Sequence, residues 1–214
     1  MPGPKTTLSR STVCEESLAR EPGDRRETIL DSAAILFARK GVAATTVRQI
    51  ADDVGILSGS LYHHFNSKEA MVDEILSSFL RDLKDRYTRV LSQKADARIL
   101  LHDLVVASLE VVEAHPHATE IYQNDLNYLL GIEHFSYLRN AGREVQDAWL
   151  KVIDAGIAEG VFRNDLDSKI LYRLMRDAIW LSVRWFKPSP AYPIAKLAED
   201  TTSLFLDGLT AKTA

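Results

Sequence analysis

The sequence predicts an all-α protein of about nine helices. Apolar residues recur three and four positions apart along most of the chain, which is the period of a helix with one buried face. Gly and Pro fall between these segments, where they interrupt the helical backbone. No stretch alternates apolar and polar residues at every second position, as a half-buried strand would. The expected helices cover residues 24–40, 46–54, 58–65, 68–93, 96–114, 116–130, 135–159, 167–186 and 194–209.

The composition indicates a soluble globular chain. Of its 214 residues, 46% are hydrophobic and 26% are charged, which excludes a fully disordered or collagen-like protein. Cys14 is the single cysteine, so no intrachain disulfide can form. The sequence has neither the apolar core of a signal peptide nor an apolar run long enough to span a bilayer. We therefore expect a cytoplasmic protein without a membrane partner.

The charge is unevenly distributed around a net value of −4. Residues 1–68 hold 9 Lys and Arg against 8 Asp and Glu, a balance of +1. Residues 69–214 hold 17 against 22, a balance of −5. This small asymmetry agrees with a nucleic-acid-binding first part but does not require one.

The first elements follow in chain order. Residues 1–23 mix Pro, Gly, Ser and charged residues without periodicity, and we expect a flexible leader. Ile29, Ala33 and Phe37 then recur every four residues along one helical face. Gly41 follows at the position where a helix C-cap favours glycine.

Two short helices come next, and their spacing is typical of a helix-turn-helix. Thr46 and Gln49 have the spacing of a capping box, which opens the first short helix, and Gly55 marks the turn after it. In the second short helix, Leu61 and Phe65 are four apart and are expected to dock inward. Small or hydrogen-bonding residues remain on its outer face: Ser58, Gly59, Ser60, Tyr62 and His63.

This region resembles the DNA-binding signature of TetR-family transcriptional regulators. The resemblance covers residues 25–69 and is densest in the run Thr45-Thr-Val-Arg-Gln-Ile-Ala-Asp-Asp-Val-Gly-Ile-Leu-Ser-Gly-Ser-Leu-Tyr-His-His-Phe-Asn-Ser-Lys-Glu69. The family usually places Ser or Thr where Leu57 stands, as the cap of the recognition helix. Because leucine cannot cap through its side chain, Ser58 is a candidate for that role, and the sequence leaves open which residue caps the recognition helix.

The resemblance implies a role for each matching residue. Thr46 and Arg48 would contact phosphates, and Lys68 would hold a further phosphate, although an ordinary solvated helix start is the alternative for Lys68. Tyr62 and His63 would contact the DNA backbone and a base. Ser58, Gly59 and Ser60 would face the floor of the groove.

The resemblance also implies the domain organisation. Residues 24–69 would form the DNA-binding domain, and residues 70–214 would form a ligand-binding and dimerisation domain. The expected partners are operator DNA, a small-molecule effector and a second copy of the chain, paired through the last two helices.

The segment 167–186 carries an unusual stripe of basic residues. At 100° per residue, Arg173, Arg176, Trp180 and Arg184 share one line on the helix. Guanidinium groups bind phosphate, and an indole face can stack on a planar ring, so the stripe favours an anionic, planar ligand. The alternative is an exposed or dimer-facing stripe in which Arg173 pairs with Asp177.

A narrower resemblance bears on the ligand. Three runs resemble the actinobacterial TetR-type repressors of sterol catabolism, most of all those that control degradation of the C and D rings. The resemblance implies an effector that is a CoA thioester of a sterol-derived bicyclic propanoate. The runs are Leu57-Ser-Gly-Ser-Leu-Tyr-His-His-Phe65, Glu159-Gly-Val-Phe-Arg-Asn-Asp-Leu-Asp167 and Arg176-Asp-Ala-Ile-Trp-Leu-Ser-Val-Arg-Trp-Phe186.

With such an effector, Arg176 and Trp180 are the expected contacts, and Arg184 is a third. Trp149 and Tyr122 are either pocket walls or plain core residues. A fatty acyl-CoA or another hydrophobic small molecule remains an alternative effector. An enzyme acting on an acyl-CoA is the other alternative, but the histidines lack metal-ligand spacing and no nucleophile motif occurs. We therefore expect no catalytic residue, no metal and no cofactor apart from the effector.

Overall fold

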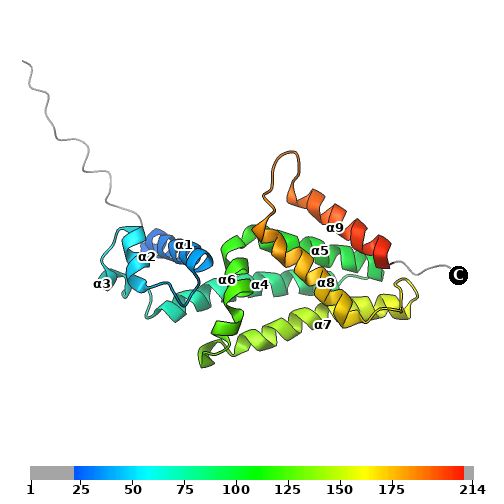
Figure 1. The fold of residues 1–214 in the computed structure, drawn as a ribbon, viewed down its shortest axis with the longest axis horizontal. Coiled ribbons are helices and arrows are strands. Elements are labelled where there is room, and N and C mark those ends of the chain that lie inside the picture. The colour runs from blue at the N-terminus through cyan, green and yellow to red at the C-terminus, as the bar shows by residue number, and fades with distance from the viewer. Residues whose placement is uncertain (1–21, 210–214) are drawn as a thin grey trace, which may run out of the picture.

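The computed structural model describes residues 22–209, and this part of the chain is all-α, as predicted (Figure 1). Most of the expected leader, with Cys14, lies outside the described residues, and the first helix begins two residues earlier than expected. Among the described helices, none is both long and apolar enough to cross a membrane. The helices are α1 (Pro22–Lys40), α2 (Val47–Val54), α3 (Ser58–Leu61), α4 (Lys68–Leu91), α5 (Ala97–Ala114), α6 (Pro116–Leu129), α7 (Tyr137–Ala158), α8 (Ser168–Trp180) and α9 (Ile194–Leu209), with 3-10 helices at Glu133–Phe135 and Leu181–Arg184.

Side-chain caps determine where several of these helices begin. The Gln49 N–H donates to the Thr46 hydroxyl at 3.2 Å, and the Thr46 N–H donates to the Gln49 side chain at 3.0 Å, which confirms the predicted capping box. The side chains of Ser67 and Asp96 cap α4 and α5 by accepting backbone N–H bonds of the first turn. Gly55 ends α2 with φ 71°, a left-handed conformation that glycine adopts without steric cost.

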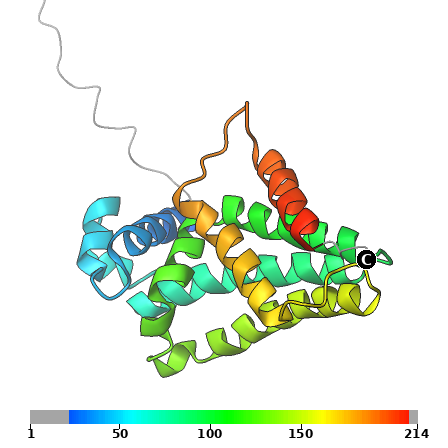
Figure 2. The same ribbon diagram turned by 45° about the vertical axis from the view of Figure 1, so that its right-hand side comes forward.

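The helices form a small N-terminal domain and a larger body (Figures 1 and 2). The N-terminal domain consists of α1, α2 and α3, and α4 leaves it to run along the body. In the body, α5 packs against α4, α7, α8 and α9. Helix α6 contacts both α1 and α4, so it lies between the N-terminal domain and the body.

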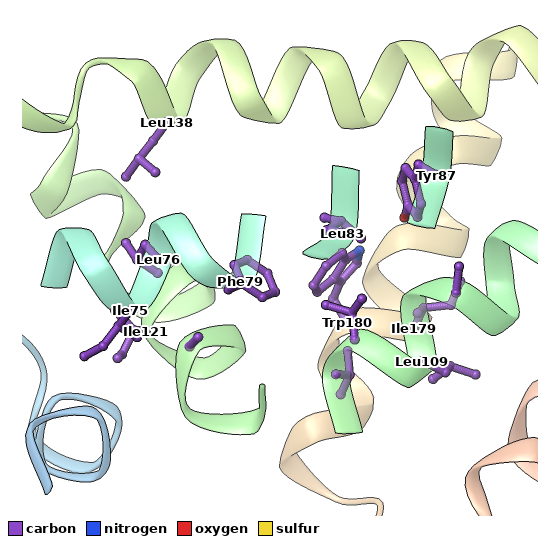
Figure 3. Packing of buried hydrophobic residues seen from close by; sticks show 14 of the residues in the cluster. Ile75, Leu76, Phe79, Leu83, Tyr87, Leu109, Ile121, Leu138, Ile179 and Trp180 are labelled. Carbon is purple, nitrogen blue, oxygen red and sulfur yellow. The ribbon is translucent and has the colours of Figure 1, made fainter. Parts of the chain in front are cut away.

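The body core lies between α4, α5, α7 and α8, and Figure 3 shows Phe79, Leu83 and Trp180 together there. Polar groups inside this core are paired with one another. The Trp149 indole N–H donates to the Tyr87 hydroxyl at 2.9 Å, and that hydroxyl lies 2.6 Å from the hydroxyl of Ser108. Trp149 is 1% exposed. Of the two roles expected for Trp149, the structure supports the core residue.

Two helices end earlier than the sequence pattern predicts. Helix α3 ends at Leu61 and continues as turns, and α8 ends at Trp180. After Trp180 the Ser182 hydroxyl donates to the Ile179 carbonyl at 2.6 Å, and the chain continues as a 3-10 helix. A serine side chain that bonds a nearby carbonyl competes with the α-helical ladder. Side chains beyond Trp180 therefore leave the 100° step on which the predicted basic stripe depends.

Candidate functional sites

Helix α3 presents a small polar surface to the outside. Its inner face is fixed because Leu61 and Phe65 are buried, as predicted, and the Arg26 guanidinium lies 4.4 Å from the centre of the Phe65 ring. On the outer face, Tyr62 is 54% exposed. The neighbouring residues that the sequence places outward are exposed at Gly59, Ser60 and His63 and half-buried at Ser58.

The structure answers the open question of how α3 begins. Leu57, and not Ser58, occupies the N-cap position, and Ser58 is the first helical residue. The Ser60 and Leu61 N–H groups both donate to the Leu57 carbonyl, at 2.9 and 3.3 Å, so backbone bonds alone close the first turn. The capping residue that the sequence left open is therefore Leu57, without a side-chain cap. The Leu57 side chain, 80% exposed, projects beside the polar surface.

Thr46 and Arg48 flank this surface at the start of α2. The Thr46 hydroxyl accepts the capping bond described above, and its own proton remains available for a phosphate oxygen. The Arg48 side chain is 84% exposed and lies 3.8 Å from Asp52. An exposed pair at that distance is weak, so the guanidinium is free to exchange Asp52 for a stronger anion.

Lys68 lies at the start of α4 and is half-buried. Its ammonium group donates to the carbonyl oxygens of Val42 and Thr45 at 2.7 and 3.1 Å. Two of the three donor positions of the ammonium thus hold the turn between α1 and α2, and one is left for a phosphate.

The body contains a cavity of about 360 Å³ between α4, α6, α7 and α8. Its inner wall is apolar and aromatic, whereas three arginines stand among the lining residues. None of the described residues that line it is acidic. The lining consists of Phe79, Leu80, Leu83, Tyr122, Gln123, Leu126, Leu130, Leu138, Arg139, Gly142, Arg143, Val145, Gln146, Tyr172, Arg176 and Trp180.

Trp180 forms part of the apolar wall of this cavity. The indole is 4% exposed and meets the Phe79 ring edge to face, with the ring centres 5.6 Å apart (Figure 3). It packs in the core and also lines the cavity, so the indole can contact an apolar or planar group of a ligand there.

Two phenols and a guanidinium lie beside this wall. Burial raises the pKa of Tyr172 to about 12, against an opposing effect of Arg176, so the phenol stays neutral. Burial also raises the pKa of Tyr122, again opposed by Arg176. Arg176 is half-buried and donates to Asp177 at 2.6 and 2.8 Å. An incoming anion would compete with this exposed carboxylate for the guanidinium.

Comparison with known families gives a clear match to these two parts of the chain. Residues 29–75 match the family described as bacterial regulatory proteins, tetR family. Residues 92–209, more than half of the chain, match the tetracyclin repressor-like C-terminal domain. The chain belongs to the TetR family. Members of this family are transcriptional regulators that bind operator DNA, and the chain is a regulator rather than an enzyme.

Individual relatives of this TetR-family chain cover most of its length. It is 45% identical over 185 residues to the HTH-type transcriptional repressor KstR2 of Rhodococcus jostii, covering 86% of this chain and 91% of that one. It is 41% identical over 195 residues to KstR2 of Mycobacterium tuberculosis, covering 91% and 98%. The solved structure of the ketosteroid transcriptional regulator KstR2 of M. tuberculosis is similar with a TM-score of 0.83 and 42% identity, covering 88% of this chain and 96% of that one.

The cavity of this TetR-family chain contains some of the predicted ligand residues and not others. Arg176, Trp180 and Tyr122 line it, whereas Trp149 and Arg184 do not. The Arg184 guanidinium donates to the Asn124 side chain of α6 at 2.6 Å, because the 3-10 helix redirects it. The expected single stripe of three arginines along one helix is therefore absent from the described α8.

Two arginines of the cavity are not among the ligand residues that the sequence predicts. Arg139 and Arg143 lie four residues apart on α7, so both face the cavity from one side of that helix. The i, i+4 spacing was visible in the sequence. The spacing alone could not show that the arginines of α7 and α8 line the same cavity.

Proposed function

We propose that this TetR-family chain is a repressor in sterol catabolism that releases a palindromic operator when it binds a CoA thioester of a sterol-degradation intermediate. Relatives at 41–45% identity bear the name of a KstR2 repressor, and the solved relative is titled a ketosteroid regulator. The observation that carries the effector class is the cavity, which combines an apolar aromatic wall with three guanidinium groups and has no acidic residue among its described lining. Apolar rings and phosphates on one molecule match that combination.

Two copies of the chain pair through α8 and α9. Ile170 and Leu174 of α8 are 52% and 63% exposed and lie four residues apart, and Leu204 of α9 is 73% exposed. Leucine and isoleucine this exposed on two helices that both pack on α5 support an interface between two copies. A two-fold axis there would place two recognition helices on half-sites about 34 Å apart, one turn of DNA.

The effector acts by shifting the equilibrium between two states of this dimer. Tyr122 and Leu126 of α6 line the cavity, and α6 also packs on α1 of the DNA-binding domain. A ligand that repositions α6 would change the separation of the two DNA-binding domains. It weakens operator binding only as far as it prefers the other state, and the operator must weaken ligand binding by the same factor.

A mobility shift on the DNA upstream of this chain's own gene tests the proposal. The complex is titrated with a bicyclic thioester (indanyl-propanoyl-CoA), with palmitoyl-CoA and with the two free acids. Release by the bicyclic thioester alone supports the sterol assignment, and release by palmitoyl-CoA alone points to a fatty acyl effector. Retardation that no thioester relieves would overturn the proposed effector.

Variants of α8 connect the result to the cavity. Arg176→Met keeps the aliphatic stem and removes the charge, so it should retain operator affinity and lose the response to thioester. Arg173→Met is the matched control, because Arg173 is exposed on the same helix and does not line the cavity.

The dimer is tested separately by sedimentation. Leu174→Glu should yield monomers, whereas Leu166→Glu, at a 41% exposed position just before α8, should not. Dimers that survive Leu174→Glu unchanged would contradict the proposed interface.

A further inference from the structure

The three arginines of the cavity come from two helices and differ in their hydrogen-bond and ion-pair partners. Arg139 and Arg143 come from α7 and Arg176 from α8. Arg176 meets the carboxylate of Asp177, and Arg143 donates only to the neutral amide of Asn140. The Arg139 side chain has no hydrogen bond or ion pair with any described residue. Of these three guanidinium groups, only that of Arg176 is thus paired with a carboxylate among the described residues.

This arrangement is unfavourable without an anion. Like charges four residues apart on a helix repel, and Arg139 and Arg143 are such a pair. Both side chains are exposed, so solvent and salt screen the repulsion between them. Screening reduces the repulsion but does not turn it into an attraction. A bound anion would convert the repulsion into charge-assisted hydrogen bonds.

The turn of α7 between the two arginines also brings in α6. A Cβ atom at Gly142 would lie 3.3 Å from the Tyr122 hydroxyl, so the absence of a side chain there lets the phenol approach α7. That hydroxyl makes no hydrogen bond with the described residues, and the raised pKa of Tyr122 keeps it a donor. It supplies a fourth donor beside the guanidinium groups.

The cavity is therefore apolar at one end and positively charged at the other. Phe79, Leu83 and Trp180 are buried at its inner end, whereas Arg139 and Arg143 are exposed at its outer end. A volume of about 360 Å³ is near the low end for sites that hold drug-sized ligands, and a whole CoA thioester is far larger than such a ligand. The acyl group fits inside and the nucleotide must remain at the mouth.

We propose that Arg139 and Arg143 of α7, together with Arg176 of α8, bind the phosphates of the effector at the cavity mouth, with the acyl end pointing inward. This inference rests on the proposed function and adds to it the orientation of the ligand and two specificity-determining residues. The phosphates contact arginines of both α7 and α8, and the Tyr122 hydroxyl adds a contact from α6.

Calorimetry with two matched ligands tests the assignment. Indanyl-propanoyl-CoA carries the phosphates, and S-(indanyl-propanoyl)-pantetheine carries the same acyl end without any phosphate. Arg139→Met and Arg143→Met should each raise the Kd of the CoA thioester about tenfold, the effect of losing one charge-assisted hydrogen bond. The Kd of the pantetheine thioester should stay within about twofold, and the dependence of the CoA thioester's Kd on salt should become shallower.

Arg173→Met serves as the control for a change of net charge and should leave both Kd values unchanged. Equal weakening of the two ligands, or equal effects of all three substitutions, would overturn the assignment. If wild-type protein binds neither thioester, the proposed function fails and the arginines are then tested with 8-anilinonaphthalene-1-sulfonate, an apolar anion without a nucleotide. Unchanged fluorescence titrations in Arg139→Met and Arg143→Met would then exclude the anion site as well.

Discussion

The carboxylate of Asp125 on α6 accepts a hydrogen bond from the backbone N–H of Val42, in the turn between α1 and α2, at 3.2 Å. The two residues are 83 positions apart, so the bond ties the body to the DNA-binding domain. Gly41, with φ 84°, allows this approach, since a Cβ there would lie 3.4 Å from the Asp125 oxygen. The other carboxylate oxygen of Asp125 is buried and has no partner among the described residues.

This buried carboxyl should make stability depend on pH. Burial raises the pKa of Asp125 above its ordinary 3.8, against the opposing effects of the Val42 N–H and Lys68. The folded protein therefore binds the proton more tightly than the unfolded chain. The stability this proton contributes is fully present below pH 3.8 and is lost as the pH rises through the raised value.

Asp125→Asn removes that titration. The amide oxygen can still accept from Val42 N–H, and the charge is gone, so the variant should be more stable than wild type at pH 7 by about 1 kcal/mol, or about 2–4 °C in Tm. The advantage should shrink as the pH falls toward 3.8. Thermal unfolding at several pH values measures it, with Asp154→Asn, at an exposed position on α7, as the control that should show no such trend.

Substitutions of Lys68 and Arg48 should separate structural from electrostatic contributions to operator binding. Lys68→Met removes the donor that holds the Val42 and Thr45 carbonyls, so it should lower both the melting temperature and operator affinity. Arg48→Met should leave the melting temperature unchanged and reduce by about one the slope of log affinity against log salt. Equal melting temperatures for the two variants would contradict the bracing role of Lys68.

Tyr62 should contribute to operator binding without contributing to the fold. Because its ring is 54% exposed on the outer face of α3, Tyr62→Ala should weaken operator binding about tenfold and leave the dimer intact. Tyr128→Ala is the matched control, because it also removes an exposed tyrosine ring, 43% exposed on α6 in the body. Gel shift and sedimentation of both variants decide the point, and comparable losses of affinity would argue against a contact by Tyr62.

A glycine inside α7 should tolerate no side chain. A Cβ at Gly156 would lie 2.2 Å from the Phe162 ring and 2.9 Å from the Ala97 side chain, in a fully packed region. Gly156→Ala should therefore cost about 1–3 kcal/mol of unfolding free energy. Gly208→Ala, in α9 with nothing within 4 Å of the new Cβ, should be neutral or stabilising by up to about 1 kcal/mol. Denaturant unfolding compares the two.

Local rules were sufficient to predict most of the fold. The capping pair Thr46 and Gln49 and the left-handed Gly55 depend on neighbouring residues alone, and the pattern predicted them correctly. The end of α8 at Trp180 could not be read from the periodicity, because apolar residues continue through the 3-10 helix that follows. The alignment of Arg184 with Arg176 on one stripe assumed that the α-helix continues past Trp180.

The ligand site was only partly predictable, because it combines side chains from four helices. Arg176 could be identified from its own helix, but Arg139 became a candidate only when α7 was seen to share a cavity with α8. Leu57 shows the same limit at the other site. Its departure from the expected serine or threonine was evident, yet the outcome, a helix start closed by backbone bonds alone, required the local geometry.

If two copies pair through the exposed residues Ile170, Leu174 and Leu204 of α8 and α9, as proposed, operator binding depends on the concentration of the chain. Association of two copies is second order in concentration, so dilution below the dimer Kd lowers operator occupancy and the melting temperature together. Operator occupancy should then rise more steeply than in proportion to the amount of protein. A change in expression level would consequently alter repression even at a constant effector concentration.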